Sequence, residues 1–161
     1  MNADCMAVQT FIGTPGESRS LELLCRTADA GTRYGIPTLG VVAVGKQMER
    51  TEKFFQLATR VLAENGANVV KSYFCEGFER VAAACPVPIV IAGGKKLPEL
   101  DALEMAYQAI DQGAHGVDMG RNIFQSDCPA GMAQAIGKVV HEGYTAKQAY
   151  EVYQEVKNQN A

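Results

Sequence analysis

The sequence has no tryptophan, only two histidines, and no pair of cysteines at the CxxC spacing. Its five cysteines are an odd number and are scattered along the chain, at Cys5, Cys25, Cys75, Cys85 and Cys128. This pattern is typical of reduced thiols in a cytoplasmic protein. Because His115 and His141 lie far apart and no Cys/His cluster has zinc-site spacing, we expect no metal site.

Long hydrophobic runs and a strong net charge are also missing. No run approaches ~18 apolar residues, and no basic segment followed by a long apolar one opens the chain, so we expect no membrane span and a cytoplasmic location. The net charge is −3, without the basic stripe that binding of nucleic acid requires. A phosphate-bearing substrate needs only a local positive site, so the net charge of −3 does not argue against one.

What is present is enough for a packed domain. The chain has 161 residues and is 47% hydrophobic, which predicts a single domain over residues 1–161. Five short apolar runs alternate with amphipathic stretches, so we expect parallel strands joined by helices. The runs are nearly continuous in hydrophobic residues, as in strands buried on both faces. Strands are expected within 5–12, 38–44, 68–74, 87–92 and 116–119, the second of them ended by Gly45, and helices over 17–34, 50–65, 78–84, 98–112, 129–141 and 146–157. The helix over 98–112 is expected to have Pro98 in its first turn. The expected apolar stripe of the helix over 50–65 consists of Phe54, Leu57, Ala58, Val61 and Leu62.

Five βα units are too few to close an eight-stranded barrel, which typically takes ~250 residues. Two α/β architectures remain: an open five-stranded sheet, or part of a TIM (β/α)₈ barrel. The turn after the first run reads GTPG and lacks the GxGxxG pattern of dinucleotide-binding folds. Because the first strand begins almost at residue one, we favour a partial barrel made of the five C-terminal βα units, with three further units expected before it.

Lys71 is the residue that stands out for chemistry. It lies inside the apolar run NVVKSYF, near the end of that strand where barrel enzymes place their active sites. Burial of an ammonium is costly, and desolvation favours the neutral amine that attacks a carbonyl to form a Schiff base. The structural alternative is a lysine whose ammonium reaches solvent past the strand end.

Glycine-rich turns follow the last two predicted strands. The fourth run ends in Gly93-Gly94, and the fifth ends in Gly120-Arg121. Glycines let backbone N–H groups approach an anion closely, and TIM barrels bind phosphate in the loops after their last two strands, beside a short extra helix. We therefore predict a substrate phosphate site at Gly93, Gly94, Gly120 and Arg121. Ordinary turns and a surface ion pair of Arg121 are the alternative.

Other polar side chains are weaker candidates. Asp118, in the fifth run, could contact the lysine or a substrate hydroxyl, or make a structural hydrogen bond. Tyr73 shares a strand face with Lys71 by alternation, and is either an acid/base group or a packed aromatic. Asp4 and Gln9 on the first strand are weaker still. His115 precedes the last strand, so we expect a structural role.

With these residues in place, the sequence resembles the class I aldolases of the deoxyribose-phosphate/fructose-bisphosphate aldolase group. The segments that carry the resemblance are ANVVKSYF, GFERVAAACPVPIVIAGGKKLP, HGVDMGRNIFQSDCP and PTLGVVAVGKQM, and it extends over essentially the whole chain. The similarity is strongest to the thiolase-type branch, which cleaves 3-hydroxy-5-phosphonooxypentane-2,4-dione in the degradation of autoinducer-2 phosphate.

The resemblance implies that Lys71 forms a Schiff base with a phosphorylated ketone, and that the four glycine-turn positions bind its phosphate. For the thiolase branch it implies transfer of an acetyl group to coenzyme A as cosubstrate, with dihydroxyacetone phosphate released. It also implies no tightly bound cofactor and a homo-oligomer.

Two departures from the family pattern are visible. The family's first barrel strand carries an Asp-His-Gly motif whose acid assists the lysine, and this sequence has none. The strand that carries an acid/base tyrosine in fructose-bisphosphate aldolases has Val41, Val42 and Ala43 here. The leading hypothesis is therefore an incomplete thiolase-type enzyme. The alternatives are an ordinary class I sugar-phosphate aldolase and a catalytically silent half-barrel that associates through its sheet edges.

Overall fold

The computed structural model describes residues 3–44 and 49–159. Strands and helices alternate along the chain, and the strands form a sheet in the order β1-β2-β3-β4-β5. The chain divides into two compact units, Met1–Val90 and Ile91–Ala161, each described by itself below. The expected single domain over residues 1–161 stays a prediction.

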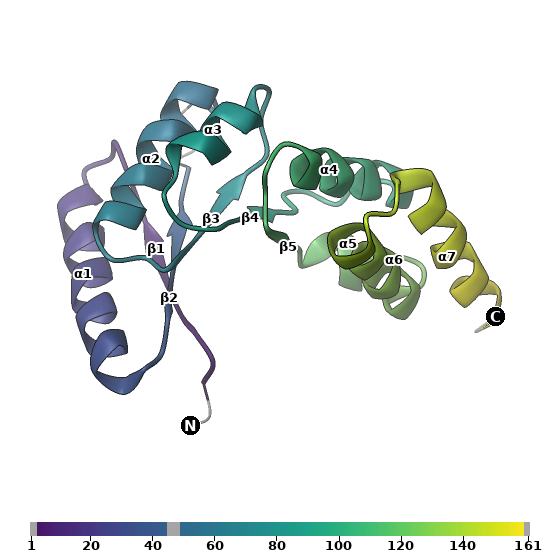
Figure 1. Ribbon diagram of the computed structural model, residues 1–161, viewed down its shortest axis with the longest axis horizontal. Coiled ribbons are helices and arrows are strands. Elements are labelled where there is room, and N and C mark those ends of the chain that lie inside the picture. The colour runs from purple at the N-terminus through teal and green to yellow at the C-terminus, as the bar shows by residue number, and fades with distance from the viewer. Residues whose placement is uncertain (1–2, 45–48, 160–161) are drawn as a thin grey trace. The chain divides into compact units, whose positions relative to one another are not determined.

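The first unit contains parallel strands with helices on one side (Figure 1). α1 packs on β1 and β2, α2 packs on β2 and β3, and α3 packs on α2. The elements are β1 (Met6–Thr10), α1 (Glu17–Tyr34), β2 (Thr38–Val42), α2 (Glu52–Glu64), β3 (Val69–Tyr73) and α3 (Phe78–Ala84), followed by β4 (Ile89–Ala92) at the boundary between the units.

Local sequence signals explain where these helices begin and end. α1 stops at Gly35, whose φ of 69° favours glycine. α2 starts after Thr51, whose hydroxyl accepts a hydrogen bond from the Phe54 N–H. Gly40 lets β2 approach α2 closely, because a Cβ there would lie 2.9 Å from Leu62 Cδ2.

The two faces of the sheet in the first unit differ in burial. Val8, Val42 and Val70 point to the helices and are at most 5% exposed. The residues between them along each strand, such as Gln9 and Lys71, are exposed or half-buried. The helix-covered face therefore forms the core of this unit, and the other face carries the polar candidates.

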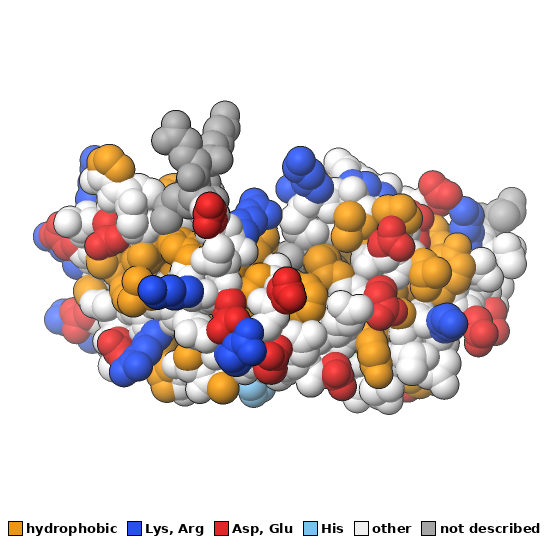
Figure 2. Space-filling view, turned by 90° about the horizontal axis from the view of Figure 1, so that it is seen from above, with side chains coloured by type: hydrophobic (Ala, Val, Ile, Leu, Met, Phe, Trp, Pro, Cys, Tyr) orange, Lys and Arg blue, Asp and Glu red, His pale blue; other side chains and the backbone are white. Residues whose placement is uncertain are grey.

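The second unit is built mainly from helices that pack on one another (Figure 1). α4 (Glu99–Asp111), α6 (Pro129–Glu142) and α7 (Ala146–Gln159) enclose a core that includes Leu103 and Met132, both fully buried. The short elements β5 (Gly116–Asp118) and α5 (Arg121–Phe124) precede α6. Figure 2 shows side chains of both charge signs interspersed with hydrophobic ones on the face in view.

The predicted elements are confirmed, and one predicted apolar stripe is wrong. The sequence analysis placed Phe54 and Leu57 in the buried stripe of α2, but Phe55 is fully buried and Leu57 is 59% exposed. Pro98, expected in the first turn of α4, lies one residue before the helix. Gly45, expected to end the second strand, lies outside the described residues.

Candidate active site

Lys71 lies on the face of β3 that the helices leave uncovered. Its neighbours Val70 and Ser72 are buried under the helices, whereas Lys71 and Tyr73 are half-buried on the opposite face. The parallel register aligns Gln9 with Val41, and Val41 with Lys71. Lys71 therefore lies in a row of side chains that crosses β1, β2 and β3, on the face of the sheet that the helices leave uncovered.

Tyr73 shares the face of Lys71, as strand alternation predicts. The guanidinium carbon of Arg50 lies 4.2 Å from the centre of the Tyr73 ring, which is a cation–π contact. The ring of Phe55 lies 6.3 Å away on another side. These contacts fit the interpretation of Tyr73 as a packed aromatic, and an acid/base role stays a prediction.

Beyond Tyr73, the strand leads to a hollow of about 340 Å³ lined by Arg50, Thr51, Glu52, Cys75, Glu76 and Arg80. Arg80 donates a hydrogen bond to the Glu52 carboxylate, which lowers the pKa of Glu52. Burial, followed by the charges of Glu52 and Glu79, raises the pKa of the Cys75 thiol. Because only a thiolate is a strong nucleophile, Cys75 is poorly suited to nucleophilic chemistry.

In the second unit, a single buried side chain joins the two glycine turns. Asn122 is fully buried, and its Nδ2 donates to the Gly93 carbonyl at 2.7 Å. Its Oδ1 accepts from the Leu97 N–H at 2.8 Å. Gly93 is required for this approach, because a Cβ there would lie 3.0 Å from Asn122 Nδ2 and 2.9 Å from Met119 Cγ. The turns after β4 and β5 are therefore held side by side.

The other predicted phosphate positions belong to the same pair of turns. Gly94 has a φ of 64° and open space around its Cα. Gly120 and Arg121 are exposed at the start of α5, so the Arg121 guanidinium is available at the surface. The structure thus brings Gly93, Gly94, Gly120 and Arg121 to one cradle of backbone within the second unit.

Three further polar side chains, Lys96, Asp118 and His115, each lie at a different part of the two turns and of β5. Lys96 Nζ binds Glu99 Oε1 at 2.7 Å and the Leu97 carbonyl at 2.6 Å, and this lysine lowers the pKa of Glu99. Asp118 is exposed at the end of β5. His115 is exposed at the opposite end of that strand, and its structural role stays a prediction.

Two residues of these sites were not singled out from the sequence. These residues are Asn122 and Arg50. Their partners, Gly93 and Tyr73, are distant in sequence, so no local pattern indicates the contacts. The one available signal for Asn122 is its place beside Gly120-Arg121, directly after a predicted strand.

Within the described residues, no group of three or more His, Cys, Asp or Glu side chains is arranged to hold a metal ion. The same part of the chain contains no helix that is both long and apolar enough to cross a membrane. The five described cysteines are free thiols spread over both units.

Comparison with known proteins places this arrangement in a family. The family model described as DeoC/LacD family aldolase matches residues 1–126. The chain belongs to the DeoC/LacD aldolase family. It is 58% identical over 158 residues to a protein of Enterobacter sp. (strain 638) named 3-hydroxy-5-phosphonooxypentane-2,4-dione thiolase, covering 98% of this chain and 54% of that one. An uncharacterized aldolase of Pasteurella multocida (strain Pm70) is 57% identical over 95% of this chain and 53% of its own length.

Solved structures agree with this aldolase-family assignment in fold. An archaeal fructose 1,6-bisphosphate aldolase superposes with a TM-score of 0.81 at 24% identity, over 88% of this chain and 60% of that one. A fructose-bisphosphate aldolase from Slackia heliotrinireducens gives a TM-score of 0.85 at 21% identity, over 96% and 54% of the two chains. The predicted α/β fold, five parallel βα units forming part of a TIM barrel, is confirmed. The chain spans about half the length of the curated relatives it matches.

Proposed function

We propose that this chain supplies the Schiff-base lysine and the phosphate cradle of a thiolase-type class I aldolase. The observation that carries the proposal is the position of Lys71 on the uncovered face of β3, two residues before the strand ends at Tyr73. Membership of the aldolase family and the 58% identity to a named thiolase support it. Because the chain spans about half of that relative, the activity is proposed for the complete enzyme.

The proposed substrate is 3-hydroxy-5-phosphonooxypentane-2,4-dione. The Lys71 amine adds to the C4 ketone and loses water, which gives an iminium ion beside the phosphate-bearing carbon. The thiolate of coenzyme A attacks the C2 ketone, and the C2–C3 bond breaks with its electron pair moving toward the iminium. The thiol proton returns to C3, and hydrolysis frees dihydroxyacetone phosphate from Lys71 and leaves acetyl coenzyme A.

The glycine turns of the second unit are proposed to bind the substrate phosphate. Backbone N–H groups at Gly94 and Gly120 lack side chains that would hinder an anion, and the exposed Arg121 adds a planar donor suited to phosphate oxygens. Asn122 keeps both turns in place through its two hydrogen bonds. No tightly bound cofactor is proposed.

The decisive experiment traps the iminium with borohydride. The chain is incubated with the diketone phosphate and sodium borohydride, and the modified residue is located by peptide mass spectrometry. We expect a reduced adduct on Lys71, its loss in Lys71→Ala, and its retention in Lys53→Ala, which removes an exposed lysine from α2 of the same unit. An adduct spread over surface lysines, or none on Lys71, would contradict the proposal.

Product analysis separates the thiolase from an ordinary sugar-phosphate aldolase. The complete enzyme is expected to form acetyl coenzyme A and dihydroxyacetone phosphate together, and only when coenzyme A is present. Release of an aldehyde without coenzyme A, with Lys71 still trapped by borohydride, would keep the Schiff base and overturn the acetyl transfer.

A further inference from the structure

The hollow of about 340 Å³ in the first unit lies beside the end of β3, the strand that carries the proposed Schiff-base lysine. Arg50 and Glu52 line it from the segment that enters α2, and Cys75, Glu76 and Arg80 line it from the turn after β3 and from α3. Ligand pockets in proteins usually measure ~300–1,000 Å³, so this hollow is large enough for part of a small molecule.

Arg50 connects this hollow with the uncovered face of β3. It lines the hollow, and its guanidinium carbon also lies 4.2 Å from the centre of the Tyr73 ring. Tyr73 follows Lys71 by two residues on the same face, which corresponds to about 6.6 Å along an extended strand. A long flexible arm that begins at Arg50 can therefore cross the Tyr73 side chain and end beside the Lys71 amine.

The electrostatic surroundings of Arg50 suit a phosphate group. Arg50 is exposed, and none of the ion pairs between described residues involves it. Its contact with Tyr73 occupies the face of the guanidinium, whereas the N–H donors lie in the plane of the group and point outward at its edge. The planar fork of donors matches the spacing of phosphate oxygens.

The part of the hollow beyond Arg50 suits a purine base. The exposed guanidinium of Arg80 is held by its hydrogen bond to Glu52, and guanidinium planes stack on nucleic-acid bases. The exposed Glu76 carboxylate is an acceptor for an exocyclic amine, and the half-buried Cys75 adds an apolar surface. Because Glu52 offsets the charge of Arg80, an uncharged ring fits here better than a second anion.

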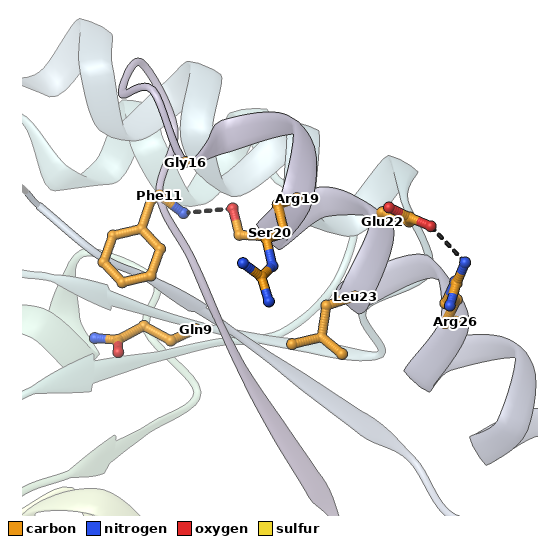
Figure 3. A pocket seen from close by; sticks show the side chains of 8 residues that line it. All are labelled: Gln9, Phe11, Gly16, Arg19, Ser20, Glu22, Leu23 and Arg26. Atoms are coloured by element: carbon orange, nitrogen blue, oxygen red, sulfur yellow. Dashed lines mark hydrogen bonds and ion pairs between the residues drawn. The ribbon is translucent and has the colours of Figure 1, made fainter.

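A larger hollow in the same unit, of about 440 Å³, is farther from the reacting amine. It lies along the end of β1 and α1, with Phe11 on the strand side and Arg19 on the helix (Figure 3). Two strand spacings, about 9–10 Å across the sheet, separate β1 from β3. Arg26 of this hollow is already paired with Glu22, as Figure 3 shows.

We propose that the hollow beside β3 binds coenzyme A, with the adenosine against Arg80, the diphosphate at Arg50, and the thiol arm along Tyr73 toward Lys71. The proposal rests on the thiolase function proposed above, which requires the coenzyme thiol to attack a substrate that is bound to the lysine. It adds the site that holds the coenzyme and the route by which its thiol reaches that substrate.

Alkylation of Cys75 tests the site directly in the 161-residue chain. Acetyl coenzyme A is the probe, because its sulfur is blocked and does not consume the reagent. N-ethylmaleimide is added at about pH 8.5, near the ordinary pKa of a thiol, and each cysteine is followed by peptide mass spectrometry. At a probe concentration of ~10 times Kd, we expect alkylation of Cys75 to slow about tenfold. The exposed Cys25 on α1 is the internal control and should react at an unchanged rate.

Arginine variants test the diphosphate contact by calorimetry with the same probe. Arg50→Ala is expected to weaken binding about tenfold or more, because a charge-assisted contact is lost. Arg50→Lys should retain more of the affinity, since the positive charge remains. Arg19→Ala is the matched control, because it removes an exposed arginine from the larger hollow and should leave the affinity unchanged.

The outcomes separate this site from its alternatives. Unchanged alkylation of Cys75 in the presence of the probe, or weaker binding in Arg19→Ala but not in Arg50→Ala, would overturn the proposal. The Tm of Arg50→Ala should match that of the wild type, and the protection of Cys75 decides if it does not. Failure of the proposed thiolase function has a different signature: Cys75 would be protected, but borohydride would trap no adduct on Lys71.

Discussion

Asn122 is the residue on which the glycine turns of the second unit most depend. In the native structure, Asn122 Nδ2 lies 2.7 Å from the Gly93 carbonyl oxygen and Asn122 Oδ1 lies 2.8 Å from the Leu97 nitrogen. Replacement of Asn122 by alanine leaves both backbone groups without their buried partner. We expect Asn122→Ala to lower the free energy of unfolding by on the order of 2 kcal/mol or more, measured by urea denaturation.

The matched control is Asn158→Ala, which removes an exposed amide from α7 and should change the unfolding free energy by less than about 0.5 kcal/mol. Equal effects of the two variants would show that the amide of Asn122 does not hold the turns. In the complete enzyme, the same loss should raise the KM for the phosphorylated substrate more than it lowers kcat.

At the same scale, some residues of the candidate site could be predicted from the sequence and others could not. Lys71 is visible because a charged side chain inside an apolar strand contrasts with its neighbours, and Tyr73 follows from strand alternation. Asn122 is bound to Gly93 and Leu97, which lie 29 and 25 residues away. Such contacts depend on how loops meet after folding, which hydrophobic periodicity does not encode.

At the scale of elements, α1 illustrates how closely a helix approaches the strand that follows it. Gly31 is buried in α1, and a Cβ there would lie 2.4 Å from the Ile36 carbonyl oxygen. That oxygen belongs to the backbone and cannot move aside without displacing the turn before β2. We expect Gly31→Ala to lower the free energy of unfolding by about 1–3 kcal/mol, despite the better helix propensity of alanine.

Gly137 in α6 provides the control, because a Cβ there meets no atom within 4 Å. Gly137→Ala should raise the free energy of unfolding by up to about 1 kcal/mol through helix propensity alone. The two variants make the same chemical change in two helices, so their opposite signs isolate the close approach at Gly31. A gain in both would show that the turn at Ile36 adapts.

The ion pair between Glu52 at the start of α2 and Arg80 in α3 predicts a pH dependence. The hydrogen bond from Arg80 lowers the pKa of Glu52 below its ordinary value of 4.5. The pair therefore stabilises the fold fully above that value, and its contribution is lost as the pH falls through the lowered pKa. The stability difference between wild type and Glu52→Gln should be largest near neutral pH and vanish in acid.

Thermal unfolding across the range from pH 7 to about pH 3 checks this expectation, and Glu155→Gln on the exposed side of α7 serves as the control. A difference for Glu52→Gln that stays constant with pH would mean that the contact contributes through packing rather than charge. The effect should also decrease in high salt, because both partners are partly exposed.

A comparison of predicted and observed helices shows how much a sequence pattern determines at the scale of elements. α1 and α3 begin and end as predicted, because α1 stops at Gly35 and α3 ends just before Cys85-Pro86, where the chain cannot continue as a helix. In α2, Phe54 and Phe55 are adjacent and equally apolar, so the period alone could not choose between them. The choice follows from packing against the strands, which places Phe55 beside Ala58 and Leu62 in the core.

At the scale of the whole molecule, the chain carries five βα units of a barrel and spans about half the length of the curated relatives it matches. The aldolase family was predictable because several long segments carry its pattern. The division into two compact units was not, because apolar runs of equal strength occur in both halves.

The unmatched length of the relatives gives the last prediction at this scale. The resemblance to the family places an acid/base group in the part of the barrel that the 161 residues do not match. A correctly placed acid/base group contributes roughly 10²–10⁴-fold. Borohydride trapping at Lys71 of the 161-residue polypeptide should therefore be slower, by about 10²-fold or more, than trapping at the equivalent lysine of the full-length Enterobacter thiolase, as followed by mass spectrometry over time. Lys71→Ala should remove the trapping altogether. Equal trapping rates in the two proteins would show that the unmatched region contributes no group to the formation of the Schiff base.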